Sequence, residues 1–289
     1  MSDQQTAHIS TRTTLAPALN GWEIYLEDQG SSPHTVKAFI GDMNILVSYL
    51  PPDHTIGNIT TNDLNNFLDW MQNERGVPCS PKTLARRITS IKAFFSWLHD
   101  AGVVLVDPAA KVVQKSVRSP LPEALTPDET EAVLNVAEQY RTAAEADTRY
   151  CTLVELLLST GIKKSECLNL SPNHIHLDAP EPILFVRYDN PNYRYKERKI
   201  PLSESWVEFY HEYDAIYELS DRLFPWSPRR LEYLLEDLSD EAGLGKHLSF
   251  RMCRWTSALT DWRAGMEKDK IRQKLGISKI QWREVSQKL

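Results

Sequence analysis

The feature that most constrains the fold is a repeated helix start, in which serine or threonine precedes proline and a run of apolar residues at helical spacing. Ser32-Pro33, Ser80-Pro81 and Thr126-Pro127 each have this form. A hydroxyl side chain caps the free N–H groups of a first helical turn, and proline suits the first helical position because its missing N–H would have no partner there. The chain is therefore predicted to be mainly helical.

The first half is predicted to be a small helical bundle over residues 15–113, preceded by a polar, flexible tail over residues 1–14. Helices are expected from Leu15 to Leu26 and from Pro33, Thr61 and Pro81 onward. On the last of these, five apolar residues share one face and are predicted to face the core: Leu84, Ile88, Ile91, Phe95 and Leu98.

The second half is predicted to be a separate α-rich domain over residues 122–289, joined by a polar, proline-broken linker over residues 114–121. Helices are expected over 127–140 and 146–158, and again from Trp206 onward. Between them, I-L-F-V-R-Y and Y-K-E-R-K-I-P-L flank the turn-rich D-N-P-N and predict a small antiparallel hairpin. The fold class is thus mainly α with one small antiparallel sheet.

Composition narrows the class of protein. The N-terminus is polar, and no run approaches the roughly 18 apolar residues that a membrane span needs, so we expect a cytoplasmic protein. Four cysteines without C-x-x-C spacing argue against a zinc site and a disulfide framework. His174 and His176 lie two apart without a third ligand nearby in sequence. We therefore expect no metal and no cofactor.

The distribution of charge is more informative than the net charge of -6. Residues 246–288 hold eleven Lys or Arg against four Asp or Glu, whereas residues 203–244 hold eleven acidic residues against three basic ones. The negative net charge of the chain therefore conceals a C-terminal region that is basic, because an acidic segment precedes it. Within that region Arg251 and Arg254 lie three apart at a helix start, and paired guanidiniums suit phosphate or carboxylate recognition.

Five segments resemble, in order, those of the tyrosine recombinase or phage integrase family. They are S-P-H-T-V, T-L-A-R-R-I-T-S-I-K-A-F-F-S-W-L with V-D-P-A-A, L-L-L-S-T-G-I-K-K-S-E-C-L-N-L, Y-K-E-R-K-I-P-L and R-M-C-R-W-T-S-A-L. The resemblance implies a SAM-like core-binding domain over 15–113 and a catalytic-type domain over 122–289. It also implies a C-shaped protein that surrounds duplex DNA.

Active members of that family cleave DNA through a tyrosine that forms a 3′-phosphotyrosyl link without any metal. Two arginines, a lysine and two further residues, usually histidines, stabilise charge and move protons. In this chain the two arginine positions fall on Lys163 and Arg254, and the lysine position on Tyr193. The first histidine position falls on Arg251, the second histidine position on Ile277 and the tyrosine position on Ser286.

Only Arg254 of these six residues matches the family pattern. Arg251 is a competing register for the second arginine, but Ala258, Ala264 and Gly265 lie at the family's distances from Arg254. No tyrosine follows Tyr233 in the remaining 56 residues, and a serine would need activation to attack a phosphate. We therefore expect a family member that does not cleave DNA.

The leading hypothesis is a duplex DNA-binding protein that acts in recombination or integration as a structural or regulatory factor, with an active recombinase or other subunits as partners and no small-molecule substrate. The resemblance and the charges predict these DNA contacts: Lys82, Arg86, Arg87, Lys163, Arg194, Lys196, Arg198, Arg251 and Arg254.

Two alternatives stay open. One is an active site-specific recombinase whose residues are displaced or supplied by another chain. The other is a protein-interaction module on a recombinase fold, favoured by the acidic and aromatic stretch E-F-Y-H-E-Y-D-A-I-Y-E-L-S-D over residues 208–221.

Overall fold

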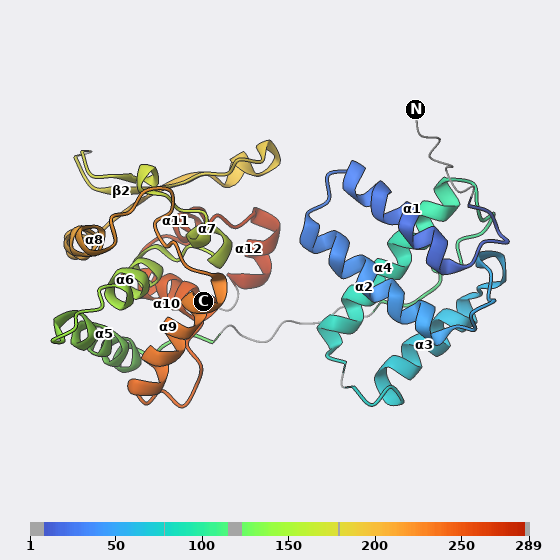
Figure 1. The fold of residues 1–289 in the computed structure, drawn as a ribbon, viewed down its shortest axis with the longest axis horizontal. Coiled ribbons are helices and arrows are strands. Elements are labelled where there is room, and N and C mark those ends of the chain that lie inside the picture. The colour runs from blue at the N-terminus through green and yellow to red at the C-terminus, as the bar shows by residue number, and fades with distance from the viewer. Residues whose placement is uncertain (1–8, 78, 115–122, 179, 287–289) are drawn as a thin grey trace. The chain divides into compact units, whose positions relative to one another are not determined.

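A computed structural model describes residues 9–77, 79–114, 123–178 and 180–286 (Figure 1). The chain divides into two compact units, Met1–Pro120 and Leu121–Leu289. Each unit has a hydrophobic core of its own. The predicted linker lies outside the described residues except for Gln114, whose side-chain amide donates to the carbonyl of Ala85 in the first unit.

The described residues of the N-terminal unit form four α-helices around one core, as the sequence predicts. The helices are α1 (Leu15–Asp28), α2 (Pro33–Tyr49), α3 (Thr61–Asn73) and α4 (Pro81–Asp100), with a short 3-10 turn η1 (Ile56–Asn58) before α3. Ser32 and Ser80 cap α2 and α4 through their side-chain oxygens, each with proline at the first position. Local capping and the apolar stripe on each helix therefore explain this unit.

Residues 9–14, which the sequence assigns to a flexible tail, contact this unit. The N–H of Ile56 donates to the carbonyl of Thr13 at 2.9 Å, and the N–H of Gly57 donates to Thr11 at 2.8 Å. Ile9 packs against the core beside Gly21. The segment is ordered because its backbone pairs with η1 and because Ile9 is buried there in part.

The C-terminal unit contains eight described α-helices, and its main core lies between α5, α6, α8, α9 and the first turn of α10. They are α5 (Pro127–Thr142), α6 (Arg149–Thr160), α7 (Lys164–Leu168), α8 (Glu204–Tyr217), α9 (Pro228–Glu241), α10 (Phe250–Arg263), α11 (Lys268–Lys274) and α12 (Lys279–Val285). A second, smaller core joins α10, α11 and α12 through Trp255, Ile271, Leu275 and Trp282.

The small sheet is three-stranded and antiparallel, in the order β1 (Ile175–His176), β2 (Ile183–Val186) and β3 (Arg198–Pro201). The predicted hairpin is present, but its connection is a 3-10 helix, η3 (Pro191–Lys196), rather than continuing strand. The sequence predicts a strand over Y-K-E-R-K-I-P-L, which contains Lys196 and Arg198, and for Lys196 that prediction is wrong. Lys196 lies on η3, as does Arg194 just before it, and Arg198 lies on β3. Proline at the start of η3 cannot donate to a strand ladder, which favours the helical turn.

Among the residues described, no helix combines the length and the apolar character needed to cross a membrane.

Candidate functional site

A tight turn between α6 and α7 forms the floor of the candidate site. Gly161 ends α6 in the left-handed region at φ 60°. A Cβ on this glycine would lie 2.8 Å from Leu275 Cδ2 and 3.2 Å from Ser257 Oγ. Glycine is therefore required twice, by its backbone conformation and by the close packing of this turn on α10 and the end of α11.

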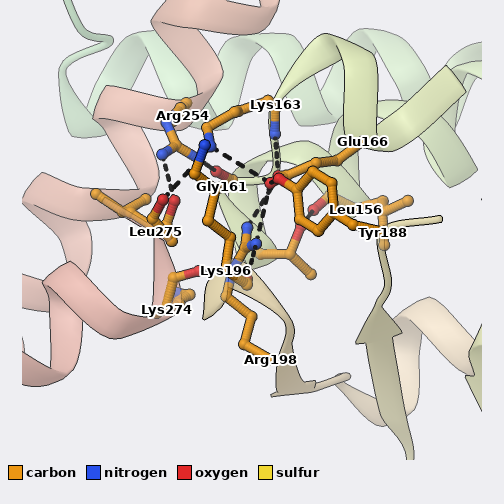
Figure 2. Close-up of polar contacts among 12 residues, drawn as sticks. Leu156, Gly161, Lys163, Glu166, Tyr188, Lys196, Arg198, Arg254, Lys274 and Leu275 are labelled. Atoms are coloured by element: carbon orange, nitrogen blue, oxygen red, sulfur yellow. Dashed lines mark hydrogen bonds and ion pairs between the residues drawn. The ribbon is translucent and has the colours of Figure 1, made fainter. Parts of the chain in front are cut away.

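Arg254 reaches this turn from α10 and is only 8% exposed. Its Nη1 donates to the carbonyl of Gly161, and its Nη2 donates to the carbonyl of Leu275 (Figure 2). Burial lowers the pKa of Arg254 to about 10, because desolvation disfavours the charged form. The guanidinium thus stays charged at neutral pH, and the negative charge of Glu166 acts to raise its pKa.

Glu166, on α7, is the centre of the polar cluster (Figure 2). Its carboxylate accepts two bonds from Arg198, at 3.0 and 2.9 Å, one from the Lys163 N–H at 2.8 Å and one from the Tyr188 hydroxyl. Burial by itself would raise the pKa of Glu166, but the bonds and charge of Arg198, with Lys163, bring it down to about 2. The carboxylate is therefore ionised under all ordinary conditions.

Lys163 caps α7 and points its ammonium into the same cluster. The Nζ atom lies 3.4 Å from the carbonyl of Gly276 and 3.5 Å from Glu166 Oε1. Burial lowers the pKa of Lys163, and the charges of Arg254, Arg198 and Lys196 act in the same direction against Glu166. Three cationic side chains, Lys163, Arg198 and Arg254, thus share one carboxylate.

Two of these cations face a cavity of about 500 Å³ in the C-terminal unit. Its lining is mostly basic and aromatic: Lys163, Lys164, Glu232, His247, Ser249, Phe250, Arg251, Arg254 and Trp255. Glu232 is the one carboxylate of the lining, and it pairs with Lys164 at 2.6 Å. Lys163, Arg251 and Arg254 therefore give this cavity an excess of positive charge.

Arg251 differs from Arg254 in its surroundings, although both lie on α10. Its side chain is exposed at the first turn of the helix, where Ser249 provides the cap. The partial positive charge of a helix N-terminus adds to that of the guanidinium. Of the two arginines that the sequence singles out, Arg254 holds backbone carbonyls and Arg251 faces the cavity.

A second hollow of about 420 Å³ lies in the C-terminal unit between the end of η3 and the segment after α11, and we call it the hairpin groove. Its lining residues are Tyr195, Lys196, Glu197, Arg198, Arg272, Gln273, Gly276, Ile277, Ser278 and Lys279. Ile277 therefore faces the hairpin groove. Tyr193, on η3, is 39% exposed and lies under the ammonium of Lys196, whose Nζ is 4.4 Å from its ring centre.

Ser286 follows α12 and is half-buried. Its N–H donates to the carbonyl of Trp282 at 2.7 Å, and its own carbonyl accepts from Lys268 Nζ at 3.1 Å. Within the described part of the chain, no hydrogen bond joins the Ser286 hydroxyl to a histidine, lysine or carboxylate. The backbone of Ser286 is thus anchored to Trp282 and Lys268.

The predicted contacts in the N-terminal unit lie on α4 and fall into two kinds. Lys82 is exposed in the first turn. Arg86 and Arg87 both turn toward the buried carboxylate of Asp42 on α2: Arg86 Nη1 bonds it directly, and Arg87 Nε lies 3.5 Å away. The side chain of Arg87 is 11% exposed and that of Arg86 is 42% exposed. These two arginines attach α4 to α2.

Sequence reasoning did not single out Glu166 or Tyr188, which organise the site. One local signal for Glu166 exists in the sequence, because it stands at the third position of α7, where a glutamate can accept from the N–H of the N-cap residue, here Lys163. For Tyr188 no local signal exists, since its partner Glu166 lies 22 residues away.

Two family models match the chain. The model described as phage integrase, N-terminal SAM-like domain, matches residues 19–102, and the model described as phage integrase family matches residues 123–283. Curated relatives include the tyrosine recombinase XerD of Listeria innocua, 27% identical over 186 residues that cover 64% of this chain and 60% of the relative. The tyrosine recombinase XerC of Mycobacterium tuberculosis is 32% identical over 161 residues, 54% of this chain and 53% of the relative.

The chain thus spans about 60% or less of the length of these relatives. Solved structures with the same fold include a lambda integrase dimer bound to a COC′ core site, with TM-score 0.72 and 16% identity over 94% of this chain and 77% of that one. XerH recombinase bound to a palindromic difH substrate has TM-score 0.73 and 17% identity over 92% of this chain and 81% of that one. Since the models together match both units and the second alone matches more than half of the residues, the chain belongs to the phage integrase family of tyrosine recombinases.

Proposed function

We propose that this chain binds duplex DNA through its backbone phosphates and does not cut it. The observation that carries the proposal is the cavity on α10, whose lining holds Lys163, Arg251 and Arg254, while its one lining carboxylate, Glu232, already pairs with Lys164. A phosphate oxygen is the ligand that such a set of donors recognises, because it accepts charge-assisted bonds from several cations at once.

Loss of cleavage is supported by the residues that occupy the family's catalytic positions. The family's nucleophile position falls on Ser286, whose hydroxyl has no activating partner within the described residues. The lysine position falls on Tyr193, and Lys163 replaces a planar, bidentate donor by a point charge. Such a site holds a phosphodiester but lacks an activated group to attack it.

We infer that the protein acts in recombination or integration beside other subunits. The lambda integrase and XerH structures that share its fold are complexes with DNA, and the former is a dimer. A chain that occupies a site without cutting it would serve as a structural or regulatory subunit of an assembly whose cleavage is supplied by an active recombinase.

Fluorescence anisotropy of the protein on labelled duplex DNA, at a series of salt concentrations, tests the binding. We expect micromolar or tighter affinity at low salt and a steep loss of affinity as salt rises, because each neutralised phosphate releases counterions. Absence of binding at low salt would refute the proposal.

One matched pair of variants locates the contact. Arg251→Gln removes the exposed cation of the cavity, and we expect weaker binding with a salt slope reduced by about 1. Arg263→Gln makes the same change of charge at the other end of α10, outside the cavity, and is expected to leave the slope as it is. Equal effects of the two changes would remove the cavity from the interface.

A suicide DNA substrate tests the cleavage. If the chain does not cleave DNA, no protein–DNA adduct survives denaturation. An active recombinase of the family, run in parallel, yields such an adduct. A covalent adduct of this chain would establish the alternative, an active recombinase with displaced residues.

A further inference from the structure

The connection between β2 and β3 carries two solvent-exposed tyrosines that the proposed function does not use. Tyr195 is 71% exposed and Tyr193 is 39% exposed, and both lie on η3 in the sequence Y-R-Y-K. Exposed aromatic rings that alternate with cations are the composition of a surface on which nucleobases stack.

The geometry fixes both rings beside one ammonium. A 3-10 helix has three residues per turn, so Tyr193 and Lys196 fall on the same face of η3. Lys196 Nζ lies 4.4 Å from the ring centre of Tyr193 and 5.1 Å from that of Tyr195. The ring of Tyr193 makes an edge-to-face contact with the ring of Tyr188, and the ring centres are 6.0 Å apart. Tyr195, by contrast, keeps most of its surface open.

Tyr195 and Lys196 form one wall of the hairpin groove, and Ile277 and Lys279 belong to the same lining. A groove of about 420 Å³ lies within the range of sites that take small organic groups. It therefore offers an aromatic surface, an apolar wall and ammonium groups together. An unpaired nucleotide has a complementary set, with a flat base for the ring and a phosphate for the lysines.

We propose that the hairpin groove binds an unpaired nucleobase, stacked on Tyr195, with the adjoining phosphate on Lys196 and Lys279. The inference rests on the proposed DNA binding and specifies the form of the DNA. In an intact duplex every base face is covered by its neighbours, so a ring can stack only on a base that has left the helix. The chain accordingly prefers DNA with an unpaired segment to DNA that is paired throughout.

The test compares two labelled duplexes of equal length, one fully paired and one with a central bubble of unpaired thymines. We expect the wild-type protein to bind the bubble about tenfold more tightly, as one stacked base contributes on this order. Tyr195→Leu is expected to abolish the preference while the affinity for the paired duplex is unchanged. Tyr195→Trp is expected to retain the preference, because stacking needs a ring and not a hydroxyl.

Tyr233→Leu is the matched control. Tyr233 is 41% exposed on α9 with the guanidinium of Arg229 4.7 Å from its ring centre, so it is also an exposed tyrosine beside a cation, but it lines neither hollow. This variant should keep the preference. A fluorescent base analogue in the bubble gives a second readout, because stacking on Tyr195 quenches its emission and Tyr195→Leu should restore it.

The outcomes separate this inference from the proposed function. Binding of both duplexes with equal affinity would refute the stacking site and leave the DNA-binding proposal in place. Binding of the bubble alone would support the stacking site and refute duplex binding. Binding of neither, even at low salt, would refute both.

Discussion

Among its described residues each unit has one buried carboxylate that receives cations from another element, and the two carboxylates are set in different surroundings. Asp42, 3% exposed, receives Arg86 and Arg87 from α4, together with the hydroxyl of Ser90 at 2.9 Å. Glu166, 4% exposed, receives Arg198 and Lys163. Both join two elements of their unit.

The two clusters differ in the solvent exposure of the cations and in the groups that bond them. At Asp42 the side chain of Arg86 is 42% exposed, so water solvates part of its charge. At Glu166 the side chain of Arg198 is 9% exposed, and the nearby Arg254 has backbone carbonyls as its bonding partners. A buried surplus of cations beside a cavity is costly unless an anion is present. The first cluster therefore attaches helices, and the second also suits a ligand.

Of the substitutions that test this comparison, replacing Glu166 is expected to change the free energy of unfolding most. Glu166→Gln leaves Arg198 and Lys163 without a counter-charge in a buried place, and we expect the free energy of unfolding to fall by about 3–5 kcal/mol in urea titrations. Glu232→Gln is the control, since Glu232 pairs with Lys164 at 40% exposure, and its loss should be below about 1 kcal/mol. Similar losses for the two variants would contradict the central role of Glu166.

Lowering the pH should reproduce part of the loss of stability that is expected for Glu166→Gln. The pKa of Glu166 is lowered from 4.5 to about 2, so its contribution to stability is complete above the higher value and is lost as pH falls toward the lower one. The shift corresponds to about 3 kcal/mol at most. Unfolding midpoints measured at stepped pH should fall less steeply below pH 4.5 for Glu166→Gln than for the wild type. Parallel curves would show that Glu166 does not titrate in this way.

Asp42→Asn is expected to cost less, about 2 kcal/mol, because the partly exposed Arg86 can turn its charge to water. Hydrogen exchange of the intact chain should place the loss in α2 and α4 and leave the C-terminal unit protected. A loss as large as that of Glu166→Gln would remove the distinction between the two clusters.

Arg251→Gln has the smallest expected effect on folding, within about 0.5 kcal/mol, because the side chain is exposed. Its effect should instead appear with a ligand. Inorganic phosphate should raise the melting temperature of the wild type by preferential binding to the folded state, and raise that of the variant less. An equal response would place the anion elsewhere.

Helix starts and core faces were predicted well from the sequence because they depend on neighbouring residues. Ser32 and Ser80 accept bonds from N–H groups three positions ahead, and Thr126 forms a capping box with Glu129. Ile88, Ile91, Phe95 and Leu98 are all buried on α4, as their spacing indicates. Each of these interactions closes within one or two helical turns.

The sequence also indicated several residues of the site, but neither Glu166 and Tyr188 nor the role of each residue. Arg251 and Arg254 are three apart, yet one faces a cavity and the other bonds carbonyls of Gly161 and Leu275, 93 and 21 residues away. Likewise the sequence predicted Arg198 as a DNA contact, whereas its guanidinium pairs with Glu166, 32 residues earlier.

What the sequence by itself determined is therefore the order of the helices, their apolar faces and the motifs of the family. Only the tertiary structure decided which cations are neutralised within the fold and which remain available to a ligand. The physical reason is that charge compensation depends on distances between segments far apart in the chain, and burial makes those distances decisive.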